Sequence, residues 1–230
     1  MPGGALHESP RLPSTAKTFG VKLGATRLIY TPDSSGATLT VINPQDFPIL
    51  VQSQVYTEDK QGKAPFIVTP PLFRLDGLQQ SRVRIVSTGT AFPEDKEALY
   101  WLCVTGVPPN AASEGNGGTV NNATLDIRVR VNNCIKLMVR PTALAGQAEH
   151  IGDSITWSRE GGMLKASNAT PFFVHFREIN VGSNSVLGVN YLPPNGTQEW
   201  EYPAGAFGTV RWKVITDYGG DSREYQATLQ

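Results

Sequence analysis

The sequence predicts an all-β protein that consists of two sandwich domains in tandem. Along the chain of 230 residues, short runs recur in which apolar and polar residues alternate or β-branched and aromatic residues gather, as is typical of strands. Clusters of Pro, Gly, Asn and Asp separate these runs, and the chain holds 23 Gly and 17 Pro. No convincing amphipathic helix longer than a turn or two is present. The length suits two domains of ordinary size.

The first set of runs ends near residue 141. Turn signals at 31–36, 43–48, 58–65 and 68–73 lie between them. About seven such strands fit one immunoglobulin-like sandwich. We therefore expect a mostly flexible segment at 1–18 and an immunoglobulin-like domain at 19–141. The clearest strand-like runs of this domain are residues 20–30, 36–43, 47–57, 81–88, 98–107 and 122–141.

A second set of runs follows a short Pro/Ala/Gly linker near 141–146. Turn signals at 159–162, 181–184, 193–196 and 217–222 divide it. The spacing predicts a second, smaller immunoglobulin-like sandwich at 142–230. Its expected strands lie within residues 154–158, 163–168, 172–181, 197–202, 208–216 and 223–229.

One predicted strand stands out because it follows a long segment rich in small and polar residues, at 108–122. Its apolar face is regular and aliphatic, and two arginines on its polar face are typical of an edge strand. The sequence does not show which strand it pairs with. The apolar positions are Leu125, Ile127, Val129 and Val131, and they alternate with Asp126, Arg128, Arg130 and Asn132.

Composition excludes several classes of partner. Lys plus Arg and Asp plus Glu each number 20, so the net charge is zero and nothing points to nucleic acid or an anionic membrane. No apolar run is long enough to span a bilayer. The N-terminus has no apolar core of a secretory signal, so the protein is either cytosolic or its export signal lies outside this chain.

An enzymatic function finds little support. His7 lies in the expected flexible start, and His150 precedes the first strand of the second domain. His175 sits in an alternating run, where we expect an exposed or half-buried strand histidine. There is no G-x-S-x-G elbow, phosphate loop or H-E-x-x-H motif. We expect no catalytic residue, no cofactor, no metal and no small-molecule substrate.

The two cysteines, Cys103 and Cys134, leave two readings open. In a cytosolic protein they would be buried thiols, and in an exported protein they would be expected to pair. N-x-S/T triplets at Asn122, Asn168 and Asn195 keep a secreted or cell-surface adhesion or receptor module as an alternative. Against it, the second domain has no cysteine and the first lacks the usual immunoglobulin cysteine spacing.

Four motifs point to one family: TPPLFRL at 69–75, EALYWL at 97–102, CIKLMVRP at 134–141 and ITDYGG at 215–220. With them, nearly all of the chain resembles the periplasmic chaperones of the bacterial chaperone–usher pathway. The cysteine pair and the long segment resemble the subclass with an extended F–G loop, which serves capsule-like and atypical surface fibres. The expected location is the periplasm, and a disulfide between Cys103 and Cys134 is then expected.

The resemblance implies what the isolated strand does. Chaperones of this family lend a strand to a fibre subunit whose own sandwich lacks one, and they deliver the subunit to an outer-membrane usher. Leu125, Ile127, Val129 and Val131 match the donor positions. The alternative is that all four pack into the core of this chain. The neutral net charge departs from the basic balance expected of a member.

Further residues match the family's functional positions. Arg27 and Lys136 match the cations that grip the subunit's terminal carboxylate. Lys136 has the opposite parity from the donors, so we expect a bulge or twist near residues 132–133. Phe19, Val21 and Leu23 match the N-terminal clamp strand, or are ordinary core residues. Glu97, Arg140 and Asp217 match a charged trio that fixes the angle between the domains.

Overall fold

The first domain is a sandwich of two sheets that face each other across an apolar core. The computed structural model describes residues 14–107 and 125–229. One sheet has the order β3-β11-β9-β5-β7 and the other β2-β4-β8-β6. Their strands are β2 (Lys22–Leu23), β3 (Arg27–Tyr30), β4 (Ala37–Ile42), β5 (Ile49–Tyr56), β6 (Phe66–Thr69), β7 (Leu72–Leu75), β8 (Gln80–Ser87), β9 (Ala98–Val107) and β11 (Asn132–Val139).

Alternation along the strands builds this core as the sequence predicts. In β5, Ile49, Val51 and Val55 are buried, whereas Leu50 and Gln52 between them are exposed. Each large aliphatic side chain removed from water stabilises the fold by roughly 1.5–3 kcal/mol. The outward-facing positions of β9 and β11 are then free to face the second domain. The fully buried members of the core include Val41, Val51, Val83, Leu102 and Leu137.

The turn signal at 68–73 corresponds to a break between two strands, and the break itself is limited to Pro70 and Pro71. β6 ends at Thr69 and pairs with β8, and β7 begins at Leu72 and pairs with β5 in the other sheet. Pro70 and Pro71 lie between them, and neither can donate to a sheet. The two prolines therefore mark the point where the chain passes from one sheet to the other.

The second domain is a smaller sandwich whose core is aromatic. Trp157 lies 5.1 Å from Trp212 and 5.7 Å from Phe176 between ring centroids, so the two sheets meet over these rings. The sheets have the orders β12-β13-β17 and β15-β14-β18-β19, with β16 paired to β14. The strands are β12 (Ile155–Glu160), β13 (Met163–Asn168), β14 (Val174–Val181), β15 (Asn184–Ser185), β16 (Tyr191–Leu192), β17 (Thr197–Glu201), β18 (Val210–Val214) and β19 (Tyr225–Ala227).

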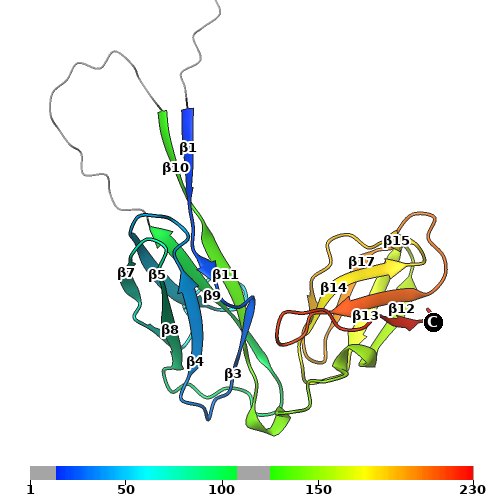
Figure 1. Cartoon of the computed structure of the whole chain (residues 1–230). Helices are drawn as coiled ribbons and strands as arrows, with labels where there is room; N and C mark the ends of the chain where they lie inside the picture. Colours follow the sequence, from blue (N-terminus) through cyan, green and yellow to red (C-terminus); the bar gives the residue numbers. More distant parts are fainter. Residues whose placement is uncertain (1–13, 108–124, 230) are drawn as a thin grey trace, which may run out of the picture.

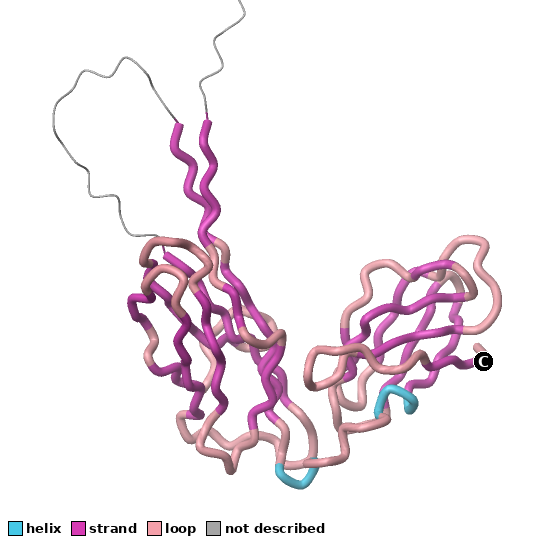
Figure 2. The backbone as a smooth tube through the Cα atoms, in the orientation of Figure 1, coloured by secondary structure: helices cyan, strands magenta, loops and turns pink. Residues whose placement is uncertain are grey.

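The linker contains two short 3₁₀ turns, η1 (Thr142–Leu144) and η2 (Ile151–Ser154). Figure 1 shows the two sandwiches set at an angle to each other, joined at one end by this segment. Figure 2 shows that strands and loops make up nearly all of the described chain. Within the described part of the chain, no helix is long and apolar enough to cross a membrane.

The isolated strand is β10 (Leu125–Arg130), and its partner is β1 (Ser14–Phe19). The two run parallel, from Ser14 opposite Leu125 to Phe19 opposite Arg130. They form a two-stranded sheet that projects beyond the first domain (Figure 1). Residues 14–18 were expected in a flexible segment, but β10 gives them a backbone partner. Residues 1–13 and the whole of the long segment lie outside the described residues.

Candidate functional site

Two cations lie side by side on the face of the first domain that is turned away from its core. Arg27 of β3 and Lys136 of β11 are register partners on parallel strands. Their strand neighbours Leu28, Ile135 and Leu137 pack in or against the first domain's core. Because side chains alternate across a strand, Arg27 and Lys136 point to the other side.

Arg27 is buried without full hydrogen bonding. Its side chain belongs to a residue only 8% exposed, and its Nε and Nη1 atoms have no hydrogen-bond partner among the described residues. Burial, and then the charge of Arg177, lower the pKa of the guanidinium, although Asp217 opposes this. A buried donor without a partner costs free energy, more so when charged. The site therefore favours an added anion that can accept from Arg27.

The groups that contact the ammonium of Lys136 are two aromatic rings and a histidine, not a carboxylate. Its ammonium lies 5.8 Å from the ring centroid of Trp101 and 4.8 Å from that of Tyr191, and it donates to Nδ1 of His175 at 2.9 Å. Burial, followed by the charge of Arg27, lowers the pKa of Lys136 to about 8. Near neutral pH the pair still carries two positive charges.

The prediction that His175 is exposed or half-buried is wrong. His175 is 4% exposed and lies on β14 with Lys136 against one ring nitrogen and Met138 against the other. Burial, followed by Lys136 and Arg27, lowers its pKa to about 2. The flanking sequence FFVHF contained the signal, because a histidine among consecutive apolar residues fits a strand covered on both faces. Here the second face is covered by the first domain.

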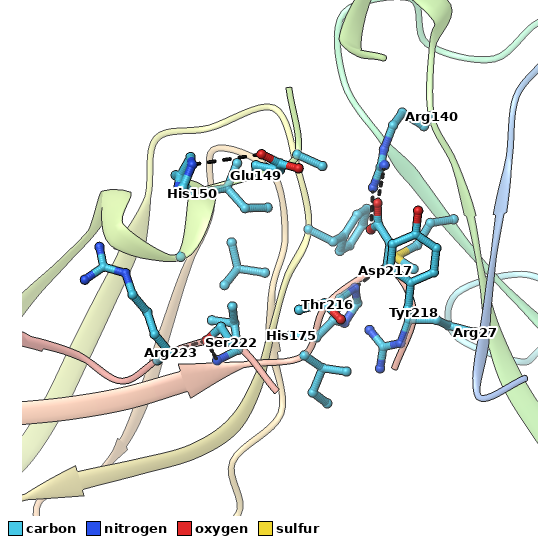
Figure 3. A pocket seen from close by; sticks show the side chains of 18 of the residues that line it. Arg27, Arg140, Glu149, His150, His175, Thr216, Asp217, Tyr218, Ser222 and Arg223 are labelled. Atoms are coloured by element: carbon cyan, nitrogen blue, oxygen red, sulfur yellow. Dashed lines mark hydrogen bonds and ion pairs between the residues drawn. The ribbon is translucent and has the colours of Figure 1, made fainter. Parts of the chain in front are cut away.

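A cavity of about 690 Å³ opens between the domains next to these residues. Arg27, Met138 and Arg140 line it from the first domain, and His175 and Asp217 are among the residues that line it from the second. Figure 3 shows Arg27, Arg140 and Asp217 on one side of it and Glu149, His150 and Arg223 on the other. Lys136 is not among the residues that line the cavity, but it contacts His175, which is.

The charged trio forms a closed set of ion pairs across the domain boundary. Arg140 Nε donates to Glu97 Oε2 at 2.9 Å, and its two terminal nitrogens donate to Asp217 at 2.7 and 2.9 Å. The other oxygen of Glu97 accepts from the backbone N–H of Phe173 at 2.8 Å. Burial lowers the pKa of Arg140, but the hydrogen bonds and charges of the two carboxylates outweigh it, so the pKa is raised. Burial also raises the pKa of Glu97. This cluster needs no ligand to be satisfied.

A disulfide joins β9, which precedes the long segment, to β11, which follows β10. Cys103 of β9 and Cys134 of β11 are directly opposite, with an S–S distance of 2.05 Å. β9 also carries Trp101, and β11 carries Lys136. The disulfide therefore fastens together the two strands that present this part of the site.

The donor and clamp residues are placed in part. Leu125, Ile127 and Val129 lie on the backbone of β10, and their side chains are outside the described residues. Val131 is 40% exposed and separates β10 from β11, one residue before the expected bulge. Its N–H donates to the carbonyl of Phe19.

Phe19, Val21 and Leu23 divide between two roles. Phe19 ends β1 and packs edge-on against Phe47 at 5.7 Å between centroids. Val21 packs in the first domain's own core and Leu23 packs against it. This agrees with the alternative that they are ordinary core residues. Only the first of the three belongs to the strand that pairs with β10.

Sequence reasoning missed Tyr191 and Trp101 as parts of this site. Tyr191 is the register partner of His175, and its hydroxyl donates to Glu58 of the first domain at 2.9 Å. Trp101 donates to the carbonyl of Glu58 at 2.9 Å. Neither role leaves a local pattern, because each depends on how the two domains meet. Within the described ranges, no cluster of three potential metal ligands is present.

Comparison with known proteins places both domains. Residues 20–145 match the model "Pili and flagellar-assembly chaperone, PapD N-terminal domain", and residues 151–226 match "Pili assembly chaperone PapD, C-terminal domain". The chaperone protein AggD of Escherichia coli is 47% identical over 221 residues, which cover 94% of this chain and 88% of that protein.

Two solved structures are similar over the whole fold. The E. coli chaperone DraB is 47% identical, with a TM-score of 0.84 over 94% of this chain and 100% of that one. The Salmonella enterica chaperone SafB, solved in complex with the SafA pilin, is 44% identical, with a TM-score of 0.85 over 95% of this chain and 100% of that chain.

Proposed function

Because the chain belongs to the PapD family of pilus-assembly chaperones, a family that is not enzymatic, we propose that it captures incomplete immunoglobulin-like fibre subunits by lending them β10. Four relationships support this function: the two family matches, the relative AggD, and a solved relative bound to a pilin. The observation on this chain that carries the mechanism is β10, which projects from the first domain with β1 as its partner.

Strand lending follows from the physics of sheet edges. A strand paired on one side still offers the backbone donors and acceptors of its other side. Leu125, Ile127, Val129 and Val131 would fill the cleft that the missing strand leaves in a subunit, each contributing roughly 1.5–3 kcal/mol if fully buried. Arg27 and Lys136 would bind the subunit's terminal carboxylate and so set the register of the lent strand. Register matters because a slip of one residue turns every side chain to the opposite face.

We also propose the finer assignments. The chain acts in the periplasm, because the disulfide is typical of an oxidising compartment. It hands its subunits to an outer-membrane usher, as the pathway requires. The disulfide that flanks the segment 108–124 supports membership of the subclass with an extended F–G loop. Glu97, Arg140 and Asp217 fix the angle between the domains.

The alternative of an adhesion or receptor module is not favoured by any observation here. Asn168 of one glycosylation triplet is 2% exposed, and its amide donates to the carbonyls of Phe172 and Pro193 at 2.7 and 3.0 Å. It holds a loop of the second domain and is closed to glycosylation.

Co-expression in a bacterial periplasm with the fibre subunit encoded beside this chain tests the function. We expect soluble subunit only when the chaperone is present. Ile127→Ala should weaken capture in a graded way, by about 2–4 kcal/mol, whereas Arg128→Ala on the opposite face of β10 should leave capture unchanged.

Two results would count against this account. Equal accumulation of the subunit without the chaperone would remove the function. A severe fall in the melting temperature of the free Ile127→Ala chaperone would show that Ile127 belongs to its own core.

A further inference from the structure

His175 is the point where the second domain meets the cation pair of the first. It lies on β14, and its imidazole reaches across to β11, where its ring nitrogens meet Lys136 and Met138, each at 2.9 Å. Its ring stacks on Phe173 at 6.2 Å between centroids. Such a contact between domains is neither part of the Glu97–Arg140–Asp217 trio nor used by the strand that is lent.

The two partners of the ring determine its tautomer. An ammonium can only donate a hydrogen bond, and a thioether sulfur can only accept one. Nδ1 of His175 must therefore be the acceptor from Lys136, and Nε2–H must be the donor to Met138. The ring is neutral, in the Nε2–H form, and it presents a lone pair to Lys136.

This neutral form is favoured by the charges that face the ring. A proton on Nδ1 would face the ammonium of Lys136, with the guanidinium of Arg27 nearby, and the pKa of His175 is accordingly lowered to about 2. The other ionisable groups near the ring are Tyr191 on β16, bonded to Glu58, and Arg140 and Asp217 in the cavity wall. His175 thus acts as a fixed acceptor.

We propose that His175 is a positioning residue for carboxylate capture: by accepting one N–H of Lys136, it holds the ammonium beside Arg27 with its remaining two N–H groups free for the subunit's terminal carboxylate. This inference rests on the proposed function. It makes the anchor a joint product of both domains, since Lys136 comes from the first and its acceptor from the second.

Three substitutions separate this role from simple packing. His175→Asn keeps an oxygen close to the place of Nδ1, His175→Gln moves the polar group toward the place of Nε2, and His175→Leu removes the acceptor altogether. Glu58→Ala is the matched control, because it breaks the bond from Tyr191 between the domains and leaves the Tyr191 ring beside Lys136.

The test measures binding of a peptide with the sequence of the subunit's last strand, ending in either a free carboxylate or an amide, across pH. For the free carboxylate we expect His175→Leu and His175→Gln to bind about tenfold more weakly than wild type, and His175→Asn and Glu58→Ala within about threefold of it. Binding should decline as rising pH removes the proton from Lys136. This decline should occur at lower pH in His175→Leu than in wild type, and at the wild-type pH in His175→Asn. The amide peptide should bind all five proteins alike.

The outcomes separate a failure of the proposed carboxylate clamp from a failure of the role proposed for His175. If Lys136→Ala binds the free-carboxylate peptide as wild type does, the carboxylate clamp itself fails. If Lys136→Ala loses binding but His175→Leu and His175→Gln keep wild-type affinity and pH profile, only the role of His175 is overturned. If His175→Leu does not fold, the pair of Asn and Gln variants decides the question by the same comparison.

Discussion

Two charged clusters occupy the boundary between the domains, and they differ in how well they are satisfied. In one, Arg140 directs its nitrogens at carboxylate oxygens of Glu97 and Asp217, all within 2.9 Å. In the other, Arg27 and Lys136 lie side by side, and the partners of Lys136 are aromatic rings and a neutral imidazole. The first cluster has its counter-charges within the chain, whereas the rings beside Lys136 in the second carry no negative charge.

The pKa values of the cations in the two clusters shift in opposite directions. The carboxylates raise the pKa of Arg140 above its usual value, so its environment favours the charged form. Burial and the neighbouring Arg27 lower the pKa of Lys136 to about 8, so its environment disfavours the charged form. The difference teaches that burial alone does not define a structural ion pair. A cluster that costs folding free energy is expected to be one that a ligand completes.

Breaking the complete cluster should have the largest effect on stability. Arg140→Met leaves the buried carboxylate of Glu97 without its counter-charge, so we expect a loss of about 3–5 kcal/mol in the free energy of unfolding. Urea denaturation measures it. Glu97→Gln is the control, since it keeps the shape and one acceptor and should cost less. A loss below about 1 kcal/mol in Arg140→Met would contradict a structural role for the trio.

Removing the disulfide should loosen the first domain, which carries the incomplete cluster, more than the second. Replacing both Cys103 and Cys134 by Ser should cost about 2–4 kcal/mol, because the unfolded chain regains the freedom of the closed loop. Hydrogen exchange should show faster exchange in β9 and β11 than in wild type, and unchanged exchange in β14 and β18. Equal loosening of both domains would show that the bond does more than hold these two strands.

Removing a charge from the incomplete cluster should stabilise the subunit-free protein, whereas the two changes above destabilise it. We expect Lys136→Met to raise the free energy of unfolding of the subunit-free chaperone by about 1–2 kcal/mol at neutral pH, discounted from the full pKa shift because the ammonium is partly exposed. The same variant should lose subunit capture. A destabilised Lys136→Met would place Lys136 among the structural ion pairs.

The smallest expected effect is the pH dependence of the difference in unfolding free energy between Lys136→Met and wild type. Lys136 keeps its proton to about pH 8 when folded, against 10.5 ordinarily, so between these values the unfolded chain binds more protons. Stability contributed by this group therefore rises with pH through that window, and the advantage of Lys136→Met should shrink there. Denaturation of both proteins at several pH values measures it, since all other groups titrate alike. A constant difference would mean that the pKa of Lys136 is not lowered.

Much of this arrangement can be predicted from sequence, for physical reasons that also set the limit. Period-two alternation places Ile49, Val51 and Val55 in a core whatever lies beyond the sheet, so the strands are predictable from local patterns. The contacts of His175 with Lys136 and Met138 are not, because they depend on how the first domain meets the second, which no local pattern encodes. Tyr191 and Trp101 were missed for the same reason. The passage of the chain between sheets at Pro70 and Pro71 reads locally as a turn.

Arg27 and Lys136 were assigned through the family resemblance, and the structure adds why two cations can share that place. They sit on adjacent strands at one register position, on the face away from the core. Composition alone would have predicted two solvated surface charges. The pairing register and the second domain together bury them.

The ionisation of Lys136 itself tests most directly whether the cation pair awaits a carboxylate. Selective labelling of lysine side chains with ¹³C lets the titration of Lys136 be followed by NMR in the free chaperone and in its complex with the subunit, with Lys136→Met to assign the signal. We predict a pKa of about 8 in the free protein. In the complex we predict an increase of at least about one unit, because a carboxylate within hydrogen-bonding distance favours the ammonium. An unchanged pKa on subunit binding would contradict the account.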